Sequence, residues 1–294
     1  MNVAIVLASA GRPVLLAEAV RTCSEQRGVD FTGVVSVPDE QSLPSDRSAL
    51  TGWRVEIGAR GLAAQRNAGL DALDIGSADG VDVVAFFDDD ALLRPDYLIN
   101  AVRFLDTHPD VLGLTGRVLL DGATSHEIDR DVAAAALVRS DEQLTTGTWR
   151  LTRELYGCNF VVRVGAVPDM RFDVRLPLYS WLEDHDFARR LAARGPIAKV
   201  DDCVIVHRAA ASGGRQAHVR LGYSQVMNPV YLQRKGSFPV WLATQQVLRP
   251  VAKNVALAAI GRSASWRRER LRGNVTAACD IVKGRLTPER IVDL

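Results

Sequence analysis

The sequence predicts an α/β sandwich with a largely parallel sheet, followed by a helical C-terminal part. In the N-terminal two thirds, short β-branched apolar runs alternate with segments of helical spacing, a pattern typical of strands and helices wound into one sheet. Val81–Phe87 is a continuous apolar run, the signature of a strand buried on both faces. Beyond residue 214 the pattern is helical and carries Arg on many turns.

Turn-forming residues divide the first part of the chain. Residues 2–8 are β-branched and apolar, which predicts a strand, and Ser9, Gly11 and Pro13 close it with a turn. Further along, the same reasoning predicts a helix over 14–25, a strand over 32–37, a helix over 61–73 and the buried strand over 81–87.

The second part of the chain continues the alternation up to residue 207. Residues 121–153 mix Ala-rich and polar stretches and receive no assignment. Small residues at 211–214 predict a loop, so we divide the chain into an α/β domain over 1–210 and a basic helical extension over 211–294. The predicted elements are a helix over 95–107, a strand over 111–119, an apolar run over 158–164, an amphipathic helix over 182–193 and a strand over 197–207.

Composition excludes several classes of protein. With 294 residues, 47% hydrophobic and 24% charged, the chain is neither disordered nor a disulfide-built miniprotein. Its four cysteines form no C-x-x-C pair, so we expect buried free thiols and neither a zinc site nor a redox dithiol. No stretch approaches the roughly 20 apolar residues that cross a bilayer, and the N-terminus does not read as a signal peptide. We therefore expect a cytosolic chain that does not span a membrane.

The formal net charge of +1 conceals a strong asymmetry. Residues 1–207 contain 21 Lys/Arg and 31 Asp/Glu, a net charge of −10. Residues 208–294 contain 15 Lys/Arg and 4 Asp/Glu, a net charge of +11. Such a segment indicates a surface for a phosphate-rich partner, either nucleic acid or anionic lipid, and the alternative is a solvated basic tail with no partner.

The strongest local signal for chemistry is the sequence FFDDD at 86–90. Because side chains alternate along a strand, we expect Asp88 and Asp90 on one side and Asp89 on the other. Ligands of open α/β sheets bind at the carboxyl ends of strands, and a divalent ion completed by a substrate diphosphate would relieve the repulsion between these carboxylates. An acidic turn that caps the helix near Pro95 is an equally good interpretation.

Two further sequences could carry chemistry. In WLEDHDFARRL at 181–191, Glu183 and Asp184 lie at a helix start, where carboxylates favour the helix dipole without any catalysis. One of them could also act as a general base on an alcohol. VIVHR at 204–208 ends a strand in His207 and Arg208 beside a Gly-rich loop. A lone histidine is more often a packed or surface residue than a ligand, but this position raises the odds of contact with a metal or a phosphate. No phosphate-loop, dinucleotide, zinc-protease or serine-hydrolase motif is present.

These pieces, in this order, resemble the family 2 glycosyltransferases of the GT-A fold, over Asn2 to about Arg208. The resemblance implies a Rossmann-like three-layer sandwich with a mostly parallel sheet and a helical C-terminal extension. It rests on five segments, which are ASAGRP at 8–13, GLAAQRNAG at 61–69, FDDD at 87–90, GCN at 157–159 and ED at 183–184.

The resemblance also implies a role for individual residues. Asp184 is expected to be the catalytic base, Asp90 and His207 the ligands of Mn²⁺ or Mg²⁺, and Arg208 and Arg215 the cations that face the donor phosphates. The expected acceptor-side residues are Gly157, Asn159, Trp181 and Glu183. The expected nucleotide-sugar-binding residues are Ser9, Gly11, Arg12, Pro13, Asp39, Arg66, Asn67, Asp88 and Asp89.

The function that follows is an inverting, metal-dependent glycosyltransferase of the hexosyltransferase type. It is expected to move a sugar from a nucleotide-diphosphate donor, with a leaning to UDP, to a hydroxyl of a lipid-linked saccharide or polysaccharide in cell-surface polysaccharide synthesis. A loop over 211–216 is expected to close over the donor and exclude water. The alternatives are a nucleotidyltransferase that makes a nucleotide sugar, and a non-catalytic membrane-surface or nucleic-acid-binding protein.

The basic extension is expected to place the enzyme on a membrane. Apolar and aromatic residues alternate with Lys and Arg over 241–272, as in helices that lie in the interface of an anionic bilayer. We therefore expect a cytoplasmic enzyme, peripheral on the inner face of the cell membrane, with no nucleic acid partner. The same helices could instead pack on the catalytic domain or form a homodimer contact.

Overall fold

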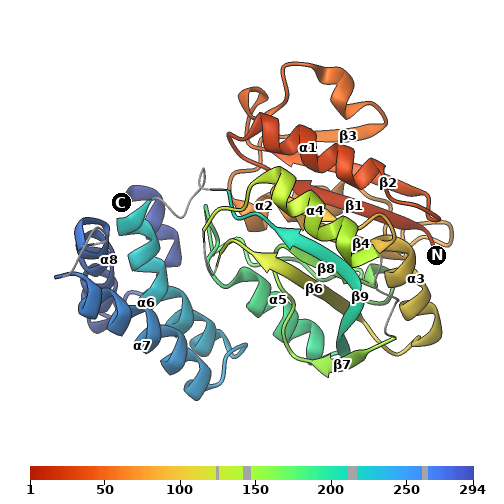
Figure 1. Cartoon of the computed structure of the whole chain (residues 1–294). Coiled ribbons are helices and arrows are strands. Elements are labelled where there is room, and N and C mark those ends of the chain that lie inside the picture. The colour runs from red at the N-terminus through yellow and green to blue at the C-terminus, as the bar shows by residue number, and fades with distance from the viewer. Residues whose placement is uncertain (124–125, 142–146, 211–216, 260–263) are drawn as a thin grey trace.

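The computed structural model describes residues 1–123, 126–141, 147–210, 217–259 and 264–294. An α/β part built on one sheet is followed by a group of helices near the C-terminus (Figure 1). The fold class that the sequence predicts is therefore confirmed: a mixed α/β structure with a mostly parallel sheet and a helical C-terminal part.

Nine strands in the described part of the chain form one sheet, in the order β3-β2-β1-β4-β8-β6-β9-β5, with β7 paired to β9. Six strands run in one direction, while β5, β7 and β8 run in the other. The carboxyl ends of β1, β4, β6 and β9 consequently meet at one edge of the sheet. The strand bounds are β1 Val3–Ala8, β2 Phe31–Val37, β3 Trp53–Ile57, β4 Val83–Asp88, β5 Ala91–Leu93, β6 Gly113–Asp121, β7 Trp149–Thr152, β8 Asn159–Val162 and β9 Ile197–His207.

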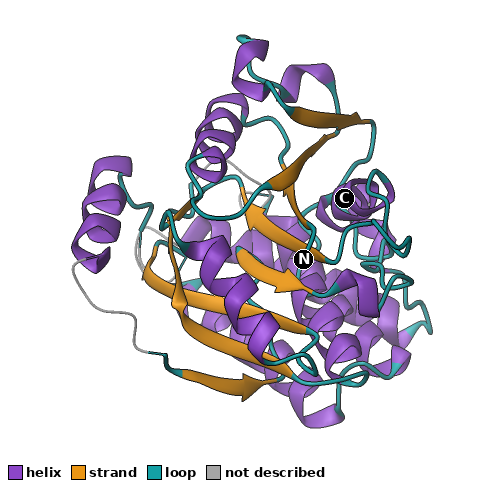
Figure 2. Ribbon diagram, turned by 90° about the vertical axis from the view of Figure 1, so that its right-hand side faces the viewer, coloured by secondary structure: helices purple, strands orange, loops and turns teal. Residues whose placement is uncertain are grey.

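Helices cover both faces of this sheet, as Figure 2 shows. On one face, α1 (Pro13–Ser24) and α3 (Tyr97–Thr107) contribute to one apolar cluster with the strands. On the other face, α2 (Leu62–Asp71) and α5 (Glu183–Ala192) contribute to a second cluster. A smaller cluster joins α4 (Arg130–Asp141) to β9. Because both faces are covered, β1 is buried along its whole length, and β4 is buried until its last residue.

In the described residues after 216, the helical part has three long helices and one short 3₁₀ helix. These are α6 His218–Lys235, α7 Val240–Leu257, α8 Ala264–Val282 and η5 Pro288–Asp293. At the crossing of α6 and α8, a Cβ on Gly222 would lie 2.1 Å from the carbonyl oxygen of Arg270, and one on Gly273 would lie 2.1 Å from that of Val219. Glycine at both positions therefore lets the two helix backbones approach closely.

The helical part is joined to the α/β part by both polar and apolar contacts. The hydroxyl of Tyr231 donates to Asp173 Oδ2 at 2.8 Å, and Lys235 Nζ donates to the same oxygen at 2.6 Å. Lys235 Nζ also lies 2.9 Å from Asp186 Oδ2 on α5. Leu176 and Leu182 add apolar contacts in a cluster with residues of α6 and α7. The helices thus pack on the α/β part, an arrangement that the sequence analysis kept as an alternative to a membrane or dimer role.

The predicted strands and helices before residue 208 are all present, with ends within two residues of the prediction. The elements that the prediction lacks are β3, β5, α4 and β7. Burial of the free thiols is confirmed for Cys23, Cys158 and Cys203, but Cys279 is exposed on α8. The predicted loop over 211–216 lies outside the described residues. No helix in the described ranges is both long enough and apolar enough to cross a membrane.

Candidate active site

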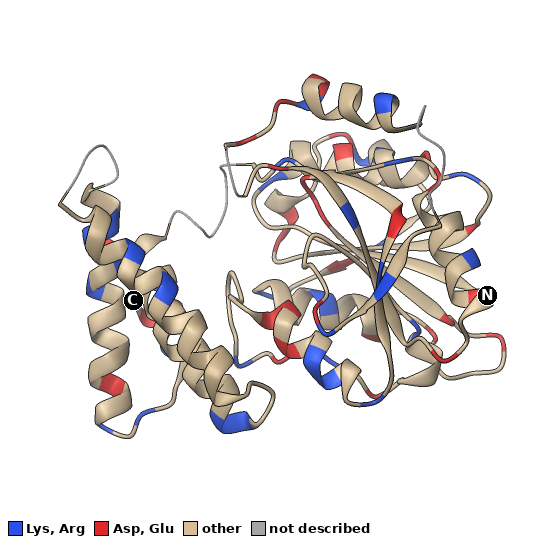
Figure 3. Ribbon diagram, turned by 60° about the horizontal axis from the view of Figure 1, so that its bottom comes forward, with Lys and Arg blue, Asp and Glu red and all other residues tan. Residues whose placement is uncertain are grey.

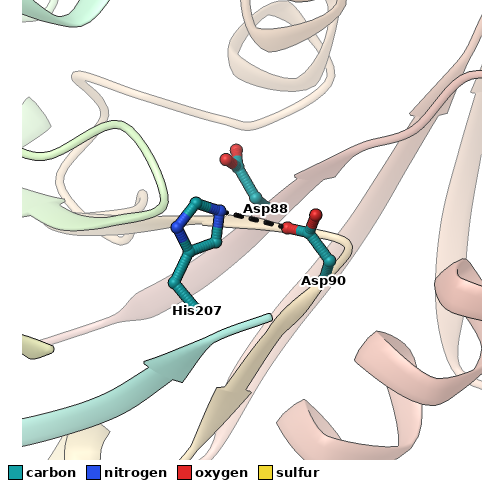
Figure 4. Close-up of side chains that lie close together, drawn as sticks. All are labelled: Asp88, Asp90 and His207. Atoms are coloured by element: carbon teal, nitrogen blue, oxygen red, sulfur yellow. Dashed lines mark ion pairs between the residues drawn. The ribbon is translucent and has the colours of Figure 1, made fainter. Parts of the chain in front are cut away.

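Two aspartates and a histidine meet at the carboxyl edge of the sheet. Asp88 ends β4, Asp90 follows in the turn before β5, and His207 ends β9. The antiparallel pairing of β5 with β9 places Ala91 opposite His207, which brings the turn and the histidine together. One ligand atom from each of the three side chains lies within 4.8 Å of the others. Figure 4 shows the three side chains converging, with His207 Nε2 3.5 Å from Asp90 Oδ1.

A fourth carboxylate orients the histidine. Asp121, at the end of β6, lies 2.9 Å from His207 Nδ1 through its Oδ1, and its Oδ2 accepts a hydrogen bond of 2.7 Å from the hydroxyl of Tyr156. Although burial disfavours its charged form, the hydrogen bonds with His207 and Tyr156 lower the pKa of Asp121 to about 2. An imidazole whose Nδ1 is held by a carboxylate presents Nε2 as a metal ligand.

The donor atoms of this cluster fit a divalent cation. Asp90 Oδ2 accepts a hydrogen bond of 2.9 Å from the backbone N–H of Ala210, but Asp90 Oδ1 is buried and has no hydrogen-bond partner among the described residues. Burial would lower the pKa of His207, but the hydrogen bond with Asp121 and the negative charge of Asp90 raise it to about 9, which shows how negative this pocket is. Two carboxylates and one imidazole are a donor set that suits Mn²⁺.

The middle aspartate of the triplet, Asp89, contacts the turn after β1. The carboxylate of Asp89 is buried, accepts a hydrogen bond from Ser9 Oγ, and forms an ion pair of 2.5 Å with Arg12 Nη2. Burial raises the pKa of Asp89 to about 7 against the opposing effect of Arg12. Asp89 is thus engaged by Ser9 and Arg12, so it anchors the turn after β1 and does not belong to the Asp88–Asp90–His207 cluster.

Two cavities adjoin at Asp88, which lines both of them. The first cavity, of about 370 Å³, lies between the turn after β1, the N-terminus of α2 and helix α6. Gln65 gives it a fixed floor, because its Nε2 donates to the carbonyl oxygens of Ser9 at 2.7 Å and Ser36 at 2.8 Å. Its lining includes Ser9, Arg12, Pro38, Gly61 and Ser224.

The second cavity, of about 540 Å³, contains the carboxylate of Asp184. Its Oδ2 accepts a hydrogen bond of 2.9 Å from the N–H of Gly157, and its Oδ1 accepts one of 2.8 Å from the N–H of His185. A Cβ at Gly157 would lie 2.9 Å from Asp184 Oδ2, so only glycine permits this approach. Two backbone donors thus orient a carboxylate that keeps lone pairs free for a hydroxyl proton.

A buried arginine, Arg66, connects Asp88 at the end of β4 with Glu183 at the start of α5. Arg66 on α2 forms an ion pair with the buried Glu183, and its Nη2 donates to Asp88 Oδ1 at 3.0 Å and to the carbonyl oxygen of Gly157 at 2.6 Å. Burial raises the pKa of Glu183 to about 8, in opposition to Arg66, and the nearby Asp184 raises it further. Glu183 therefore serves to hold Arg66, and Arg66 in turn holds Asp88 and the Gly157 backbone.

The chain just before α5 lies between the two cavities in a strained conformation. Leu178, Ser180 and Leu182 have φ values of +59°, +52° and +73°, a left-handed backbone conformation that residues other than glycine rarely adopt. The segment is held against α2, since the N–H of Leu62 donates to the carbonyl oxygen of Leu178 at 2.9 Å. Leu178 lines the first cavity, Trp181 the second, and Tyr179 both.

Several predicted residues lie elsewhere. Asp39 caps a 3₁₀ turn by accepting from the N–H of Ser42 at 3.1 Å, and Asn67 clamps the backbone of Phe172 with hydrogen bonds of 2.9 and 2.8 Å. Asn159 is buried in the sheet, where its Oδ1 accepts from the N–H of Gly116 at 2.7 Å.

Of four further predicted residues, one points away from the cavities, two shape the turn after β1 and one lies outside the described residues. Arg208 turns to Glu18, with an Nη1–Oε2 distance of 2.8 Å, and lines neither cavity, because the carboxylate on α1 competes for it. Gly11, at a φ of +66°, and Pro13, at the start of α1, shape the turn after β1. Arg215 lies outside the described residues.

Sequence reasoning missed two groups of residues. Like Asp88, Asp121 is an acidic residue at the end of an apolar strand. It was missed because the predicted strand ended at residue 119 and residues 121–153 received no assignment. The cations Lys253, Arg267 and Arg270 of the C-terminal helices line the second cavity, and only their positive charge was visible in the sequence.

Comparison with known proteins defines the fold. The sequence matches no protein-family model and no curated protein. The mannosyltransferase PcManGT from Pyrobaculum calidifontis, solved with GDP-Man and Mn²⁺, is similar in structure with a TM-score of 0.57 and 18% identity, over 95% of this chain and 87% of that chain.

Residues 1–349 of S. aureus TarS are also similar. Their TM-score is 0.58 at 13% identity, over 99% of this chain and 82% of that chain. The same fragment in complex with UDP-GlcNAc has a TM-score of 0.55 at 13% identity, over 99% and 83% of the two chains. At these identities the likeness shows the fold: this chain has the α/β architecture and helical C-terminal part of these proteins.

Proposed function

We propose that this protein is an inverting, metal-dependent glycosyltransferase of the GT-A, family 2 type, which uses a nucleotide-diphosphate sugar. The observation that carries the proposal is the position of the Asp88–Asp90–His207 cluster. It lies where two cavities adjoin, and the second cavity contains an oriented carboxylate, Asp184. The similar structures were solved with GDP-Man and Mn²⁺ and with UDP-GlcNAc, which supports a donor of this class.

The first cavity is the proposed site of the nucleoside. Its floor is rigid, and the turn that carries Ser9 and Arg12 lies at its end nearest the metal cluster. Arg12 is held by Asp89 at 2.5 Å and lies 3.4 Å from Asp90, so it balances the carboxylate charge beside the place where the diphosphate would bind.

Asp88, Asp90 and His207 are the proposed ligands of Mn²⁺ or Mg²⁺. The bound ion would neutralise the negative charge that develops on the leaving diphosphate. Asp121 orients His207, and Arg66 fixes Asp88, so the protein holds its ligands in place before the donor arrives.

Asp184 is the proposed general base. The acceptor oxygen bonds to the anomeric carbon, the bond from that carbon to the diphosphate oxygen breaks, and the hydroxyl proton passes to Asp184. Attack from the face opposite the leaving group inverts the anomeric configuration. The hydrogen bonds from Gly157 and His185 fix the direction in which the carboxylate points.

The proposed acceptor is a lipid-linked saccharide or polysaccharide at the inner face of a membrane. An exposed apolar stripe runs along α7 through Trp241, Leu248 and Val255, which recur every seven residues, and these side chains are 63%, 59% and 60% exposed. The membrane surface is smaller than the whole segment over 241–272, since Leu242 and Arg267 within it are buried. Trp241→Gln should reduce co-sedimentation of the protein with anionic vesicles. Unchanged co-sedimentation would show that this stripe is not the membrane-binding surface.

A ligand screen tests the proposed function. The full chain is mixed with UDP-, GDP- and TDP-linked sugars, with and without Mn²⁺, and its melting temperature and slow donor hydrolysis are measured. We expect one class of donor to stabilise the protein only when Mn²⁺ is present. Stabilisation by a nucleoside triphosphate together with a sugar phosphate, and by no nucleotide sugar, would show a nucleotidyltransferase instead.

A further inference from the structure

The second cavity is bounded by two groups of opposite charge. Asp88, Glu183 and Asp184, here called the acidic wall, belong to the α/β part. Lys253 on α7 with Arg267 and Arg270 on α8, here called the basic wall, belong to the helical part. Figure 3 shows that Lys and Arg predominate on the C-terminal helices, in agreement with their net charge. None of the three cations lines the first cavity, so the basic wall faces the Asp184 side of the site.

Arg267 is a buried cation without a carboxylate partner. Its side chain belongs to a residue that is only 8% exposed, and among the described residues no Asp or Glu forms an ion pair with it. Its Nε has no hydrogen-bond partner there, while its Nη1 donates to Asn254 Oδ1 at 2.7 Å. Burying an unpaired charge is costly, which indicates that the charge has a partner that the described residues do not supply.

The guanidinium groups are held in place by an indole ring. The guanidinium carbons of Arg267 and Arg270 lie 3.9 and 4.5 Å from the centre of the Trp266 ring, and His218 stacks on that ring at 5.2 Å. Trp266 therefore contacts two guanidinium groups that both line the second cavity. Lys253 forms no ion pair with any described residue, so it can turn toward an anion in that cavity.

A buried amide network fixes the position of Arg267. Asn254 Nδ2 donates to Gln225 Oε1 at 2.9 Å and to Asn274 Oδ1 at 3.1 Å, and Asn274 Nδ2 donates to the carbonyl oxygen of Gly222 at 2.7 Å. The network therefore joins α6, α7 and α8 behind the arginine. An ordered support of this kind is what a binding site needs and what a solvated basic tail lacks.

We propose that the basic wall binds a phosphate or diphosphate group on the acceptor. Planar guanidinium groups match phosphate oxygens in bidentate geometry, and Lys253 adds a mobile charge at the rim. The inference rests on the proposed function, because it takes the second cavity as the acceptor site. The phosphate belongs either to a lipid linker or to a soluble phosphorylated saccharide, and the two sources share this chemistry.

Calorimetric titration of the full chain in EDTA tests the proposal, because without metal the carboxylate cluster does not attract phosphate. The probes are farnesyl diphosphate, for a lipid-linked group, and glucose 1-phosphate, for a soluble one. We expect at least one probe to bind, and Lys253→Ala and Arg267→Gln each to weaken its binding about tenfold. The stronger probe identifies the source of the phosphate.

Matched variants control for loss of charge and for folding. Lys283→Ala and Arg234→Gln remove exposed cations from the helical part outside the cavity, and they should bind the probe as the wild type does. Lys253 is exposed, so its variant remains informative if Arg267→Gln fails to fold. Absence of binding to both probes, or equal weakening in the control variants, would overturn the proposal.

A second titration separates this proposal from the proposed function. The donor from the ligand screen is titrated with Mn²⁺ into the same variants, and its affinity should stay within about twofold of the wild type. If Lys253→Ala and Arg267→Gln weaken the donor and not the probes, the basic wall holds the donor diphosphate and the acceptor proposal fails. If no nucleotide sugar binds the wild type, the proposed function fails.

Discussion

The acidic and basic walls of the second cavity differ in how their charges are held. On the acidic wall, Asp88 and Glu183 both pair with Arg66, whose single positive charge offsets part of their negative charge. On the basic wall, Arg267 is supported by neutral amides and an indole ring, and no described carboxylate pairs with it. The difference indicates that Arg66 compensates part of the charge of the acidic wall within the chain, while the charge of Arg267 on the basic wall would be compensated by an anion from outside.

The largest expected effect comes from the acidic wall at Asp184. Asp184→Asn removes the atom that accepts the proton, so the turnover of sugar transfer should fall about 10²- to 10⁴-fold. Donor affinity with Mn²⁺ should stay within about twofold, because the nucleoside and metal residues are intact. Asp169→Asn, at an exposed carboxylate, is the control. Full turnover by Asp184→Asn would show that Asp184 is not the general base.

A second variant tests the geometry of the same carboxylate. Gly157→Ala introduces a Cβ that would lie 2.9 Å from Asp184 Oδ2, so the carboxylate must move and lose its hydrogen bond. Misplacement of a catalytic group by about 1 Å can reduce turnover about 10²-fold. Gly165→Ala, where a Cβ meets nothing closer than 3.6 Å, is the matched control. Equal turnover in the two variants would show that the hydrogen bond from Gly157 to Asp184 is not needed for sugar transfer.

The third variant tests the support of the metal cluster. Asp121→Asn weakens the hydrogen bond that orients His207, and the affinity for Mn²⁺ should fall about 10- to 100-fold. Tyr156→Phe removes only the hydrogen bond to the other oxygen of Asp121, so it should have a smaller effect. Mn²⁺ titration measures both. If Tyr156→Phe weakened binding more than Asp121→Asn, the orienting role of Asp121 would be wrong.

The smallest effect is expected in the helical part and concerns stability. Gly273→Ala places a Cβ where the carbonyl oxygen of Val219 lies only 2.1 Å away, which forces α6 and α8 apart. Such overpacking should lower the free energy of unfolding by about 1–3 kcal/mol. Val275→Ala, at a position on α8 that is 61% exposed, should change it by less than about 0.5 kcal/mol. Urea unfolding followed by circular dichroism distinguishes the two.

Local patterns predicted the Asp88–Asp90–His207 cluster. Asp88, Asp90 and His207 all follow apolar strand runs, and parallel strands bring their carboxyl ends to one edge, so alignment of the strands is enough to gather them. The alternation of side chains also separated Asp89, which points to Ser9 and Arg12 and away from the cluster.

Long-range pairing explains what the sequence could not predict. Arg208 lies beside Glu18, 190 residues away, and Arg66 pairs with Glu183, 117 residues away. No local spacing encodes such partners. The basic wall was visible only as net charge, because its position at the cavity depends on how α7 and α8 pack on α6, which the glycines at 222 and 273 permit.

Mn²⁺ binding tests the central claim most directly. The metal is titrated into the full chain while the electron paramagnetic resonance signal of free Mn²⁺ is recorded, for the wild type, Asp90→Ala and the control Asp169→Asn. If Asp88, Asp90 and His207 form the metal centre, the wild type and Asp169→Asn will bind one ion per chain with the same affinity, and Asp90→Ala will lose that binding. Equal binding by Asp90→Ala and the wild type would contradict the account.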